Sequence, residues 1–556
     1  MPKKISSFLL YLILFVLPFK GLSQTPSRDS NQDFQVPESY VDRMRKQSSL
    51  LELSLQESIH MALSNNLEIA IENFNEDLNR AQVLKVKGHY DPTMSFIVGW
   101  NSRETPTSST LQAGQGVTVN ELDGFTFDSS FIQNVGGGGT LNLSFQNGRN
   151  LTNSLFQFIN PRYDSSFNIS FIQPLWRGFF QNDTRRQIQI LNLDTKIGDT
   201  QFKQKVVEVI QQLQNQYWEL VYAVANYETQ RKSVELAIIQ YQDNKKRVDI
   251  GVMAPIEITS SKAEVARRDQ TLIQSEVQII NAQNGLKRLL ASDPLASIWD
   301  LVIIPTDSPR LRNVSSTLRQ SLDTAFRNRP ELQRIQLQIE QNEINRKFYT
   351  MEGKPNVNLR TNFGTVGAAG QVFQTLMVDL DGDGIPESSG GRVPHTSDPR
   401  YGNFSTAWGQ ISHFNFRNWG LFLDIQIPIR NRANEADLAT VTLRQRQFES
   451  TMKNQQHLIM VEVRNAYETI TTRQKSMEAA RLARQLAEEQ LDGETKRFQA
   501  GLSTNFEVLR FQRDLAENQV SELRAEVDYE LAVTALHRAM NTIVEEQDIV
   551  LAKEIN

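Results

Sequence analysis

The sequence predicts an α+β membrane protein built from two similar halves, and three observations lead to this fold class. First, residues 192–290 contain two very long helices that share a heptad pattern of apolar side chains. Second, several segments alternate like strands of about ten residues, the length that crosses a bilayer when a strand is tilted. Third, the same order of elements returns about 250 residues later, and so long a repeat is hard to obtain by chance.

Residues 1–23 have the features of a secretory signal peptide. Lys3 and Lys4 precede an apolar run from Phe8 to Phe19, and Gly21-Leu22-Ser23 fits a small-x-small cleavage site. A membrane anchor is the alternative, although the apolar run is too short to span a bilayer comfortably. Cleavage would remove three lysines and take the formal net charge from −5 to −8. We therefore expect no nucleic acid partner, because phosphate binding needs a basic face.

The composition of the chain limits how it can meet a membrane. It contains no cysteine, which suits an oxidising compartment and excludes disulfides and thiolate metal sites. Hydrophobic residues make up only 39% of the chain, so the long helices must have largely wet surfaces. After the signal peptide there is no apolar run of about 18 residues, the length of a spanning helix. If the chain crosses a membrane, we expect strands closed into a β-barrel.

We predict a flexible segment at 24–50 and a first structural repeat at 51–292. The elements expected in this repeat are, in order, a helix from Ser54 to about Lys87, a strand at about 93–103, a long exposed polar loop at 101–139, a short strand at 140–145, a strand at about 165–176 and a helical hairpin at 190–292.

The spacing of apolar residues predicts the helical hairpin. No proline occurs from Leu175 to Ala254, so nothing breaks the outgoing helix. Its apolar seam consists of Ile210, Leu213, Tyr217, Leu220, Val224, Tyr227, Val234, Ile238, Tyr241 and Val248. After Gly251 and Pro255, a second seam returns with a spacing of seven at Ile258, Val265, Leu272, Ile279 and Leu286. The two seams predict an antiparallel coiled coil.

The second half repeats this order. After a linker at 293–316, we predict a second structural repeat at 317–545 and a C-terminal tail at 546–556. The elements expected in the second repeat are a helix, strands at about 355–364 and 418–428 with a polar loop at 364–415 between them, and a helical hairpin at 433–545.

Two constant offsets relate the halves. An offset of 263 residues places Pro92 on Pro355. An offset of 250 places Arg247, Gly251 and Glu257 on Arg497, Gly501 and Glu507, and the two hairpin tips read Arg247-Val-Asp-Ile-Gly251 and Arg497-Phe-Gln-Ala-Gly501. Over essentially the whole chain, this duplicated order with its tip motifs resembles the TolC family of outer-membrane efflux and secretion channels.

The resemblance implies a homotrimer in the outer membrane of a Gram-negative bacterium. Each protomer would give four strands to a shared twelve-stranded β-barrel, and the hairpins would continue the pore as an α-helical coiled-coil barrel in the periplasm. Residues 293–312 and the C-terminal tail would lie at the equator of that tunnel. A physical argument agrees, because four strands cannot close a barrel alone and an open edge in lipid would leave backbone groups unsatisfied.

The function implied by the resemblance is that of a passive exit duct in a tripartite efflux pump or a type I secretion system. A periplasmic adaptor and an inner-membrane transporter would be its partners, besides outer-membrane lipid. We expect no enzyme, because the six histidines show no ligand spacing and Gly136–Gly139 lacks the Lys-Ser/Thr of a phosphate loop. A soluble periplasmic coiled-coil scaffold and a stand-alone porin are the alternatives.

The candidate residues for a periplasmic gate are Glu257, Glu507, Arg510 and Asp514. Glu507 matches an acidic aperture residue of the family, so a threefold ring of this side chain would narrow the mouth. Capping of the helix N-terminus explains Glu507 equally well. Arg510 is expected to pair with Glu507 or Asp514. Phe498 and Ser503 stand where the family can have a tyrosine and an arginine, so Glu257 would lack these two partners.

Two further sites are expected. The resemblance implies that the tips, with Arg247, Gly251, Arg497 and Gly501, form the docking surface for the adaptor. Separately, the acidic segment at 379–390 resembles a calcium loop, with acidic ligands at positions 1, 3, 5 and 9 and glycine at position 6. These ligands would be Asp379, Asp381, Asp383 and Glu387. Position 12 is Gly390, so a complete EF-hand is excluded, and an acidic solvated turn is the alternative.

Overall fold

The computed structural model describes residues 34–47, 49–108, 118–154, 156–309, 316–378 and 387–547. It divides into two compact units, and each unit draws on both halves of the sequence. Unit 1 consists of Met1–Gln47, Ala223–Ile279 and Leu482–Ser521, and unit 2 of Ser48–Tyr222, Ile280–Arg481 and Glu522–Asn556. The predicted signal peptide and residues 548–556 of the predicted tail lie outside the described residues.

The duplication is visible in the helices. The first half contains α2 (Leu55–Asn65), α3 (Leu67–Lys87), α5 (Asp183–Asp249) and α6 (Ile256–Leu290). Their counterparts are α7 (Leu318–Asn328), α8 (Pro330–Glu352), α10 (Arg432–Gln499) and α11 (Asn505–Met540). The lengths agree closely, with 67 and 68 residues in α5 and α10 and 35 and 36 in α6 and α11. The repeat predicted from the sequence is therefore confirmed. Shorter helices are α1 (Tyr40–Gln47), η1 (Gly88–Tyr90), η2 (Ser297–Trp299), α9 (Phe404–Ser412) and α12 (Ile543–Glu546).

The single helix predicted from Ser54 to Lys87 is divided in the structure. Asn66 ends α2 and caps α3, because its side-chain oxygen accepts hydrogen bonds from the N–H groups of Glu68 and Ile69. Its amide group donates to the carbonyl of Leu289 at 3.1 Å. The break therefore ties the short helices of the first half to the end of α6, within unit 2.

The apolar seams of the first hairpin are buried as predicted. In the outgoing seam, the side chains that are at most 3% exposed are Ile210, Leu213, Tyr217, Leu220, Tyr227, Val234, Ile238 and Tyr241. In the returning seam, the corresponding side chains are Val265, Leu272, Ile279 and Leu286, at most 4% exposed. This burial in both units is the main apolar stabilisation of the hairpin. None of the helices in the described ranges combines the length and the apolar character needed to cross a membrane.

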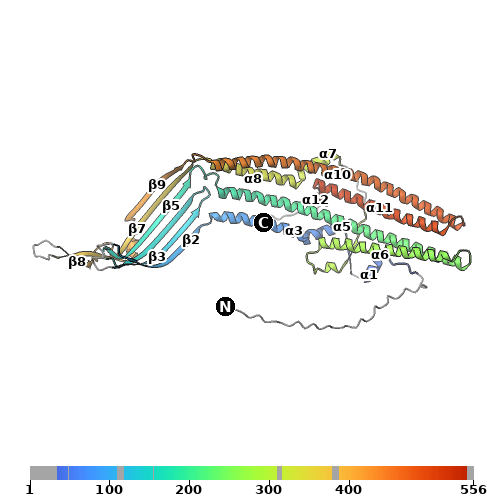
Figure 1. Cartoon of the computed structure of the whole chain (residues 1–556), viewed down its shortest axis with the longest axis horizontal. Coiled ribbons are helices and arrows are strands. Elements are labelled where there is room, and N and C mark those ends of the chain that lie inside the picture. Colours follow the sequence, from blue (N-terminus) through green and yellow to red (C-terminus); the bar gives the residue numbers. More distant parts are fainter. Residues whose placement is uncertain are drawn as a thin grey trace, which may run out of the picture. The chain divides into compact units, whose positions relative to one another are not determined.

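The strands of unit 2 form one seven-stranded sheet (Figure 1). Its strands are β2 (Thr93–Pro106), β3 (Val119–Asn134), β4 (Thr140–Thr152), β5 (Ile159–Pro174), β7 (Asn356–Val378), β8 (Glu387–Pro394) and β9 (Phe416–Gln426). Neighbours are antiparallel throughout, in the order β2-β3-β4-β5-β7-β9. β8 pairs with β7 only from Phe373 onward, past the last β7 residue that pairs with β9.

The number of strands differs from the prediction. The four predicted strands are present as β2, β5, β7 and β9, but the loop predicted at 101–139 is wrong, because it contains β3. The short strand predicted at 140–145 extends to Thr152 as β4. The loop predicted at 364–415 is also wrong, because β7 continues to Val378 and is followed by β8 and α9. One chain therefore contributes more than the four strands expected.

The two faces of the sheet differ in chemistry. Residues paired across antiparallel strands point to the same face, so the register assigns each side chain. The first face, here called the apolar face, carries Met94, Phe96, Val98, Trp100, Phe125, Phe127, Phe131, Leu141, Leu143, Phe145, Phe167, Ile169, Phe171, Phe363, Trp419, Leu421, Leu423 and Ile425. The opposite face, here called the polar face, carries Thr126, Asp128, Asn142, Ser144, Gln146, Ser166, Asn168, Ser170, Arg360 and Asn362.

A second, small sheet holds the linker of unit 2 in place. β1 (Leu50–Leu53) pairs in parallel with β6 (Val302–Pro305) beside the long helix α5. The buried hydroxyl of Tyr217 lies 3.1 Å from the carbonyl of Leu53 and 2.9 Å from the carboxylate of Asp307. Burial raises the pKa of Tyr217 above its ordinary value, so this hydroxyl stays protonated and can donate.

Replacing Tyr217 by Phe tests the attachment of this linker. We expect a loss of about 1–3 kcal/mol of stability, because buried acceptors lose their donor. Tyr222→Phe is the matched control on the same helix, since its ring contact with the Arg524 guanidinium is kept. The measurement is thermal unfolding of the detergent-purified protein by circular dichroism. Equal melting temperatures for the two variants would show that the Tyr217 hydroxyl holds nothing in place.

Candidate gate at the hairpin tips

Both helical hairpins turn on the same backbone motif. Gly251 and Gly501 follow α5 and α10 with φ of +77° and +75°, a conformation that favours glycine. The N–H of Val252 donates to the carbonyl of Arg247 at 3.0 Å, and the N–H of Leu502 donates to the carbonyl of Arg497 at 2.9 Å. These bonds close a Schellman motif at each tip. The Arg-x-x-x-Gly spacing therefore has a structural cause in each hairpin.

The arginine side chains of the two tip motifs have different partners. The guanidinium of Arg247 lies 4.7 Å from the ring centre of Phe498, which is buried on the second hairpin. Arg497 instead pairs with Glu494 of its own helix at 3.0 Å. The hydroxyl of Ser503 also donates to Glu494. The two positions where the family can have a lock are thus occupied by an aromatic contact and by a local hydrogen bond.

A buried asparagine connects the two hairpins within unit 1. Asn505, the first residue of α11, is only 4% exposed. Its amide group donates to the carboxylate of Glu257 at 3.1 Å and to the hydroxyl of Ser261 at 3.4 Å. Its side-chain oxygen accepts from Gln240 at 3.0 Å. Glu257 therefore has a partner on the other hairpin, although the tyrosine and arginine of the family are missing.

A buried arginine makes a second connection. The side chain of Arg268 is 6% exposed and forms an ion pair with Glu264 at 2.9 Å. Its guanidinium also donates to the carbonyl of Ser233 on α5 at 3.0 Å and to that of Leu509 on α11 at 3.2 Å. Burial lowers the pKa of Arg268, and Glu264 opposes this shift. The guanidinium thus links three helices of unit 1 through carbonyl groups that are otherwise difficult to satisfy.

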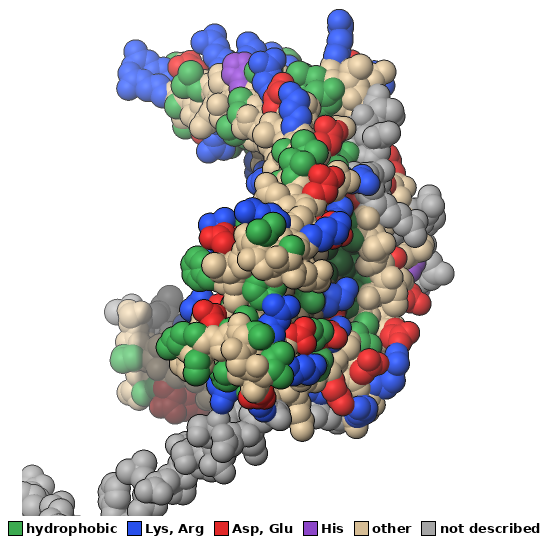
Figure 2. Space-filling view, turned by 90° about the vertical axis from the view of Figure 1, so that its right-hand side faces the viewer, with side chains coloured by type: hydrophobic (Ala, Val, Ile, Leu, Met, Phe, Trp, Pro, Cys, Tyr) green, Lys and Arg blue, Asp and Glu red, His purple; other side chains and the backbone are tan. Residues whose placement is uncertain are grey.

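The other predicted gate residues lie on the exposed side of α11. Arg510 pairs with Glu507 at 2.9 Å, with side chains 43% and 34% exposed. The carboxylate of Asp514 lies 3.8 Å from Arg513. The N–H of Glu507 donates to the hydroxyl of Thr504 at 3.4 Å, which is one of the two bonds of a capping box. Figure 2 shows acidic and basic side chains interspersed on the face it presents.

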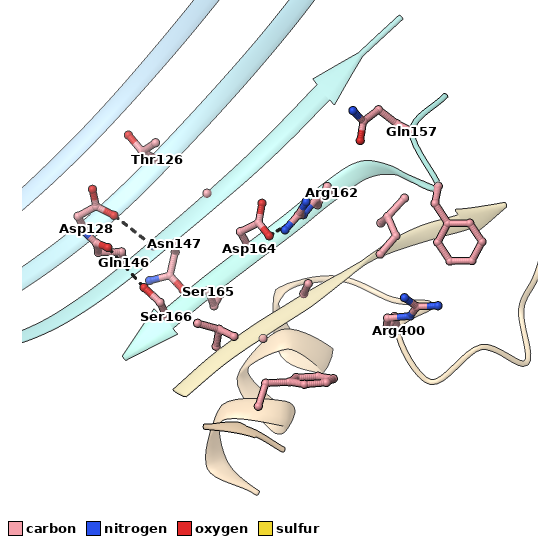
Figure 3. Close-up of a pocket in the computed structure, with 17 residues that line it drawn as sticks. Thr126, Asp128, Gln146, Asn147, Gln157, Arg162, Asp164, Ser165, Ser166 and Arg400 are labelled. Carbon is pink, nitrogen blue, oxygen red and sulfur yellow. Dashed lines mark hydrogen bonds and ion pairs between the residues drawn. The ribbon is translucent and has the colours of Figure 1, made fainter. Parts of the chain in front are cut away.

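A separate hollow lies on the polar face of the sheet (Figure 3). It has a volume of about 830 Å³, and among its lining residues are Asp128, Gln146, Asp164 and Ser166. The ion pair of Asp164 with Arg162 at 2.7 Å leaves charged groups beside neutral amides and hydroxyls. Such a mixed surface can hold water and polar solutes without selecting strongly among them.

The metal prediction lies outside the part that can be described. Asp379, Asp381 and Asp383 are not among the described residues, and Glu387 begins β8. Within the ranges that are described, no group of three or more His, Asp or Glu side chains is arranged to hold a metal ion.

Sequence reasoning missed the residues that connect the hairpins, although a signal was present. In the returning heptad, Val265 and Leu272 occupy one core position, while Ser261, Arg268 and Ser275 occupy the other. All three polar residues are at most 6% exposed. Polar side chains at a buried heptad position are typical of a packing that depends on specific partners.

Replacing Gly501 by Ala tests the backbone motif of the tip. No heavy atom lies within 4 Å of an added Cβ, so the cost comes from the positive φ alone. We expect a loss of about 1 kcal/mol, with faster hydrogen exchange at the second tip. Gly493→Ala is the matched control in the exposed interior of α10, where alanine should stabilise by up to about 1 kcal/mol. Slower or unchanged exchange in the Gly501 variant would contradict this account of the motif.

Three solved structures resemble this chain over most of its length. The CmeC outer membrane channel of Campylobacter jejuni has a TM-score of 0.58 and 13% identity, covering 90% of this chain and 90% of that chain. The outer membrane protein VceC of Vibrio cholerae has a TM-score of 0.56 and 14% identity, covering 87% and 95%. The MtrE outer membrane channel of Neisseria gonorrhoeae, solved in an open state, has a TM-score of 0.57 and 14% identity, covering 87% and 88%.

The sequence comparison locates a family domain. Residues 390–542, in the second half of the chain, match the family model of outer membrane efflux proteins. A search of curated proteins by sequence gave no match. The resemblance to the TolC family is thereby confirmed: the chain carries an outer membrane efflux protein domain and has the fold of the outer-membrane channels that it resembles.

Proposed function

We propose that this protein is the outer-membrane exit duct of a tripartite efflux pump or a type I secretion system. The observation that carries the proposal is the sheet of unit 2, whose two faces differ in chemistry across every strand from β2 to β9. A sheet of this kind suits a wall between hydrocarbon and water. The outer membrane efflux protein domain and the shared fold support the same function.

Several copies are needed to complete the duct, and a homotrimer fits the family fold. The sheet of one chain ends at β2 on one side and at β9 on the other. In hydrocarbon, the free backbone groups of both edges would lack hydrogen-bond partners, and a neighbouring copy supplies them. We place the sheet in the outer membrane of a Gram-negative bacterium and the helical hairpins in the periplasm.

The hairpin tips suit the docking of a periplasmic adaptor, which in turn would connect to an inner-membrane transporter. The backbone motif of Gly251 and Gly501 presents large apolar side chains to solvent. These are Ile250, Val252, Ile256, Leu502 and Phe506, each at least 67% exposed. Exposed apolar groups flanked by Arg247 and Arg497 form a surface that a protein partner can cover.

The gate in this proposal is the contact between the two hairpins of one chain. Asn505 and Arg268 connect them through buried hydrogen bonds, and breaking these bonds frees α11 from α6. The mouth then widens as the second hairpin moves outward. A ring formed by the Glu507–Arg510 pairs of the copies would line this mouth and set its charge.

Replacing Arg268 by Met tests the gate. The variant keeps an apolar stem but loses the bonds to Ser233 and Leu509, so single-channel conductance in planar bilayers should rise roughly twofold or more. Arg267→Met is the matched control, because Arg267 is 63% exposed and pairs only locally with the same Glu264. Recovery of each variant as a heat-modifiable oligomer checks that it is assembled.

Equal conductance of the two variants would contradict the gate and leave the duct in place. A different result would contradict the duct itself. Purified protein that stays soluble without detergent and forms no pores in bilayers would favour the soluble periplasmic scaffold. Pores that form without any binding of an adaptor protein to the tips would favour the stand-alone porin.

A further inference from the structure

We propose that β3 and β4 lie in the membrane wall itself, so that each copy contributes six strands instead of four. With three copies, the wall would hold three times six strands, that is eighteen, in place of the twelve that the family resemblance implies. This inference rests on the proposed function and goes beyond it, because it sets the width of the duct.

The pairing of β3 and β4 is continuous with that of the predicted strands. β3 pairs with β2 from Thr93–Ile132 to Pro106–Val119, which covers the whole of β2. β4 pairs with β5 from Thr140–Ile172 to Asn150–Arg162. A hairpin that stood away from the sheet would pair only within itself. These two strands instead separate β2 from β5 along their entire length.

The side chains of β3 and β4 continue the apolar face. Phe125, Phe127 and Phe131 of β3 share this face with Trp100, Val98 and Met94 of β2. On β4, Leu143 and Phe145 share it with Ile169 and Phe167 of β5. The opposite side of the same two strands carries Asp128, Ser144 and Gln146, in line with the polar face. An extracellular loop in water would gain nothing from such alternation.

Helix α9 fastens β4 to the second half of the chain. The indole N–H of Trp408 donates to the side-chain oxygen of Asn147 on β4 at 2.7 Å. The hydroxyl of Ser165 on β5 donates to the same oxygen at 2.8 Å. Asn147 and Ser165 are each 3% exposed, so α9 shields two polar groups that the register places on the apolar face. A strand covered in this way is part of the folded wall.

The number six also satisfies the geometry of closure. Neighbouring strands are antiparallel from β2 to β9, so β2 and β9 of one chain run in opposite directions. β2 of one copy can therefore pair antiparallel with β9 of the next. Both edges carry exposed apolar residues, including Val98 and Leu421 at 65% each. β8 does not take part, because it pairs with β7 beyond the end of β9.

A wider wall has a consequence for transport. The diameter of a barrel grows roughly linearly with strand number, so eighteen strands give a bore about one and a half times that of twelve. The polar side chains of β3 and β4, including Asp128 and Gln146, would then line the lumen beside those of β5 and β7. The duct would accept bulkier solutes in its membrane part than a twelve-stranded relative.

Single cysteines test the placement of β3 and β4, because the natural chain has none. Phe127→Cys and Leu143→Cys, labelled with a fluorophore and placed in vesicles of brominated lipid, should be quenched to the same extent as Val98→Cys on β2. Ser144→Cys on the polar face should escape quenching and react with a water-soluble thiol reagent. Unquenched labels at Phe127 and Leu143, with quenching at Val98, would overturn the proposal.

Electron cryomicroscopy of the detergent-purified assembly counts the strands directly. We expect eighteen around one wall. A twelve-stranded wall with β3 and β4 outside it would overturn this inference and leave the proposed function intact. An assembly without any closed wall would contradict both, so the two failures can be told apart.

Discussion

A strand in contact with lipid must have its backbone N–H and C=O groups paired, because hydrocarbon offers no hydrogen-bond partner. Each strand of this sheet from β3 to β7 has neighbours on both sides, whereas β2 and β9 each have an open edge. The apolar face reaches both of these edges, with Trp100 and Trp419 at 67% and 76% exposure. The sheet of one chain is therefore an incomplete wall, and the rest of the architecture follows from what completes it.

Unit 1 obeys a different constraint. Its hairpins are held by an apolar seam along each pair of helices, and this seam alone would allow the hairpins to slide or rotate. Asn505 and Arg268 add directional bonds to buried carbonyls and side chains, which specify one arrangement. Buried polar contacts cost more to break than to keep only while all partners are satisfied. A contact of this kind can hold a closed state and release it when a partner competes for the same helices.

The sequence predicted the helices and the repeat well, because heptads and constant offsets are long-range patterns that local exceptions do not hide. It predicted β3 poorly. The segment around Phe125, Phe127 and Phe131 alternates, but glycine, aspartate and serine between them made the average composition that of a loop. The partners of Asn505 and Arg268 could not be predicted, since they come from residues more than 200 positions away. Heptad spacing shows that a position is buried and not what it meets there.

The central claim is that copies of this chain complete one another through β2 and β9. Disulfide trapping tests it most directly, in variants with Val98→Cys on β2 combined in turn with Leu421→Cys, Leu423→Cys or Ile425→Cys on β9. The claim predicts that oxidation in the native membrane yields, for at least one pair, a ladder of covalent oligomers that ends at the trimer. Chains that stay monomeric on a denaturing gel for every pair would contradict it.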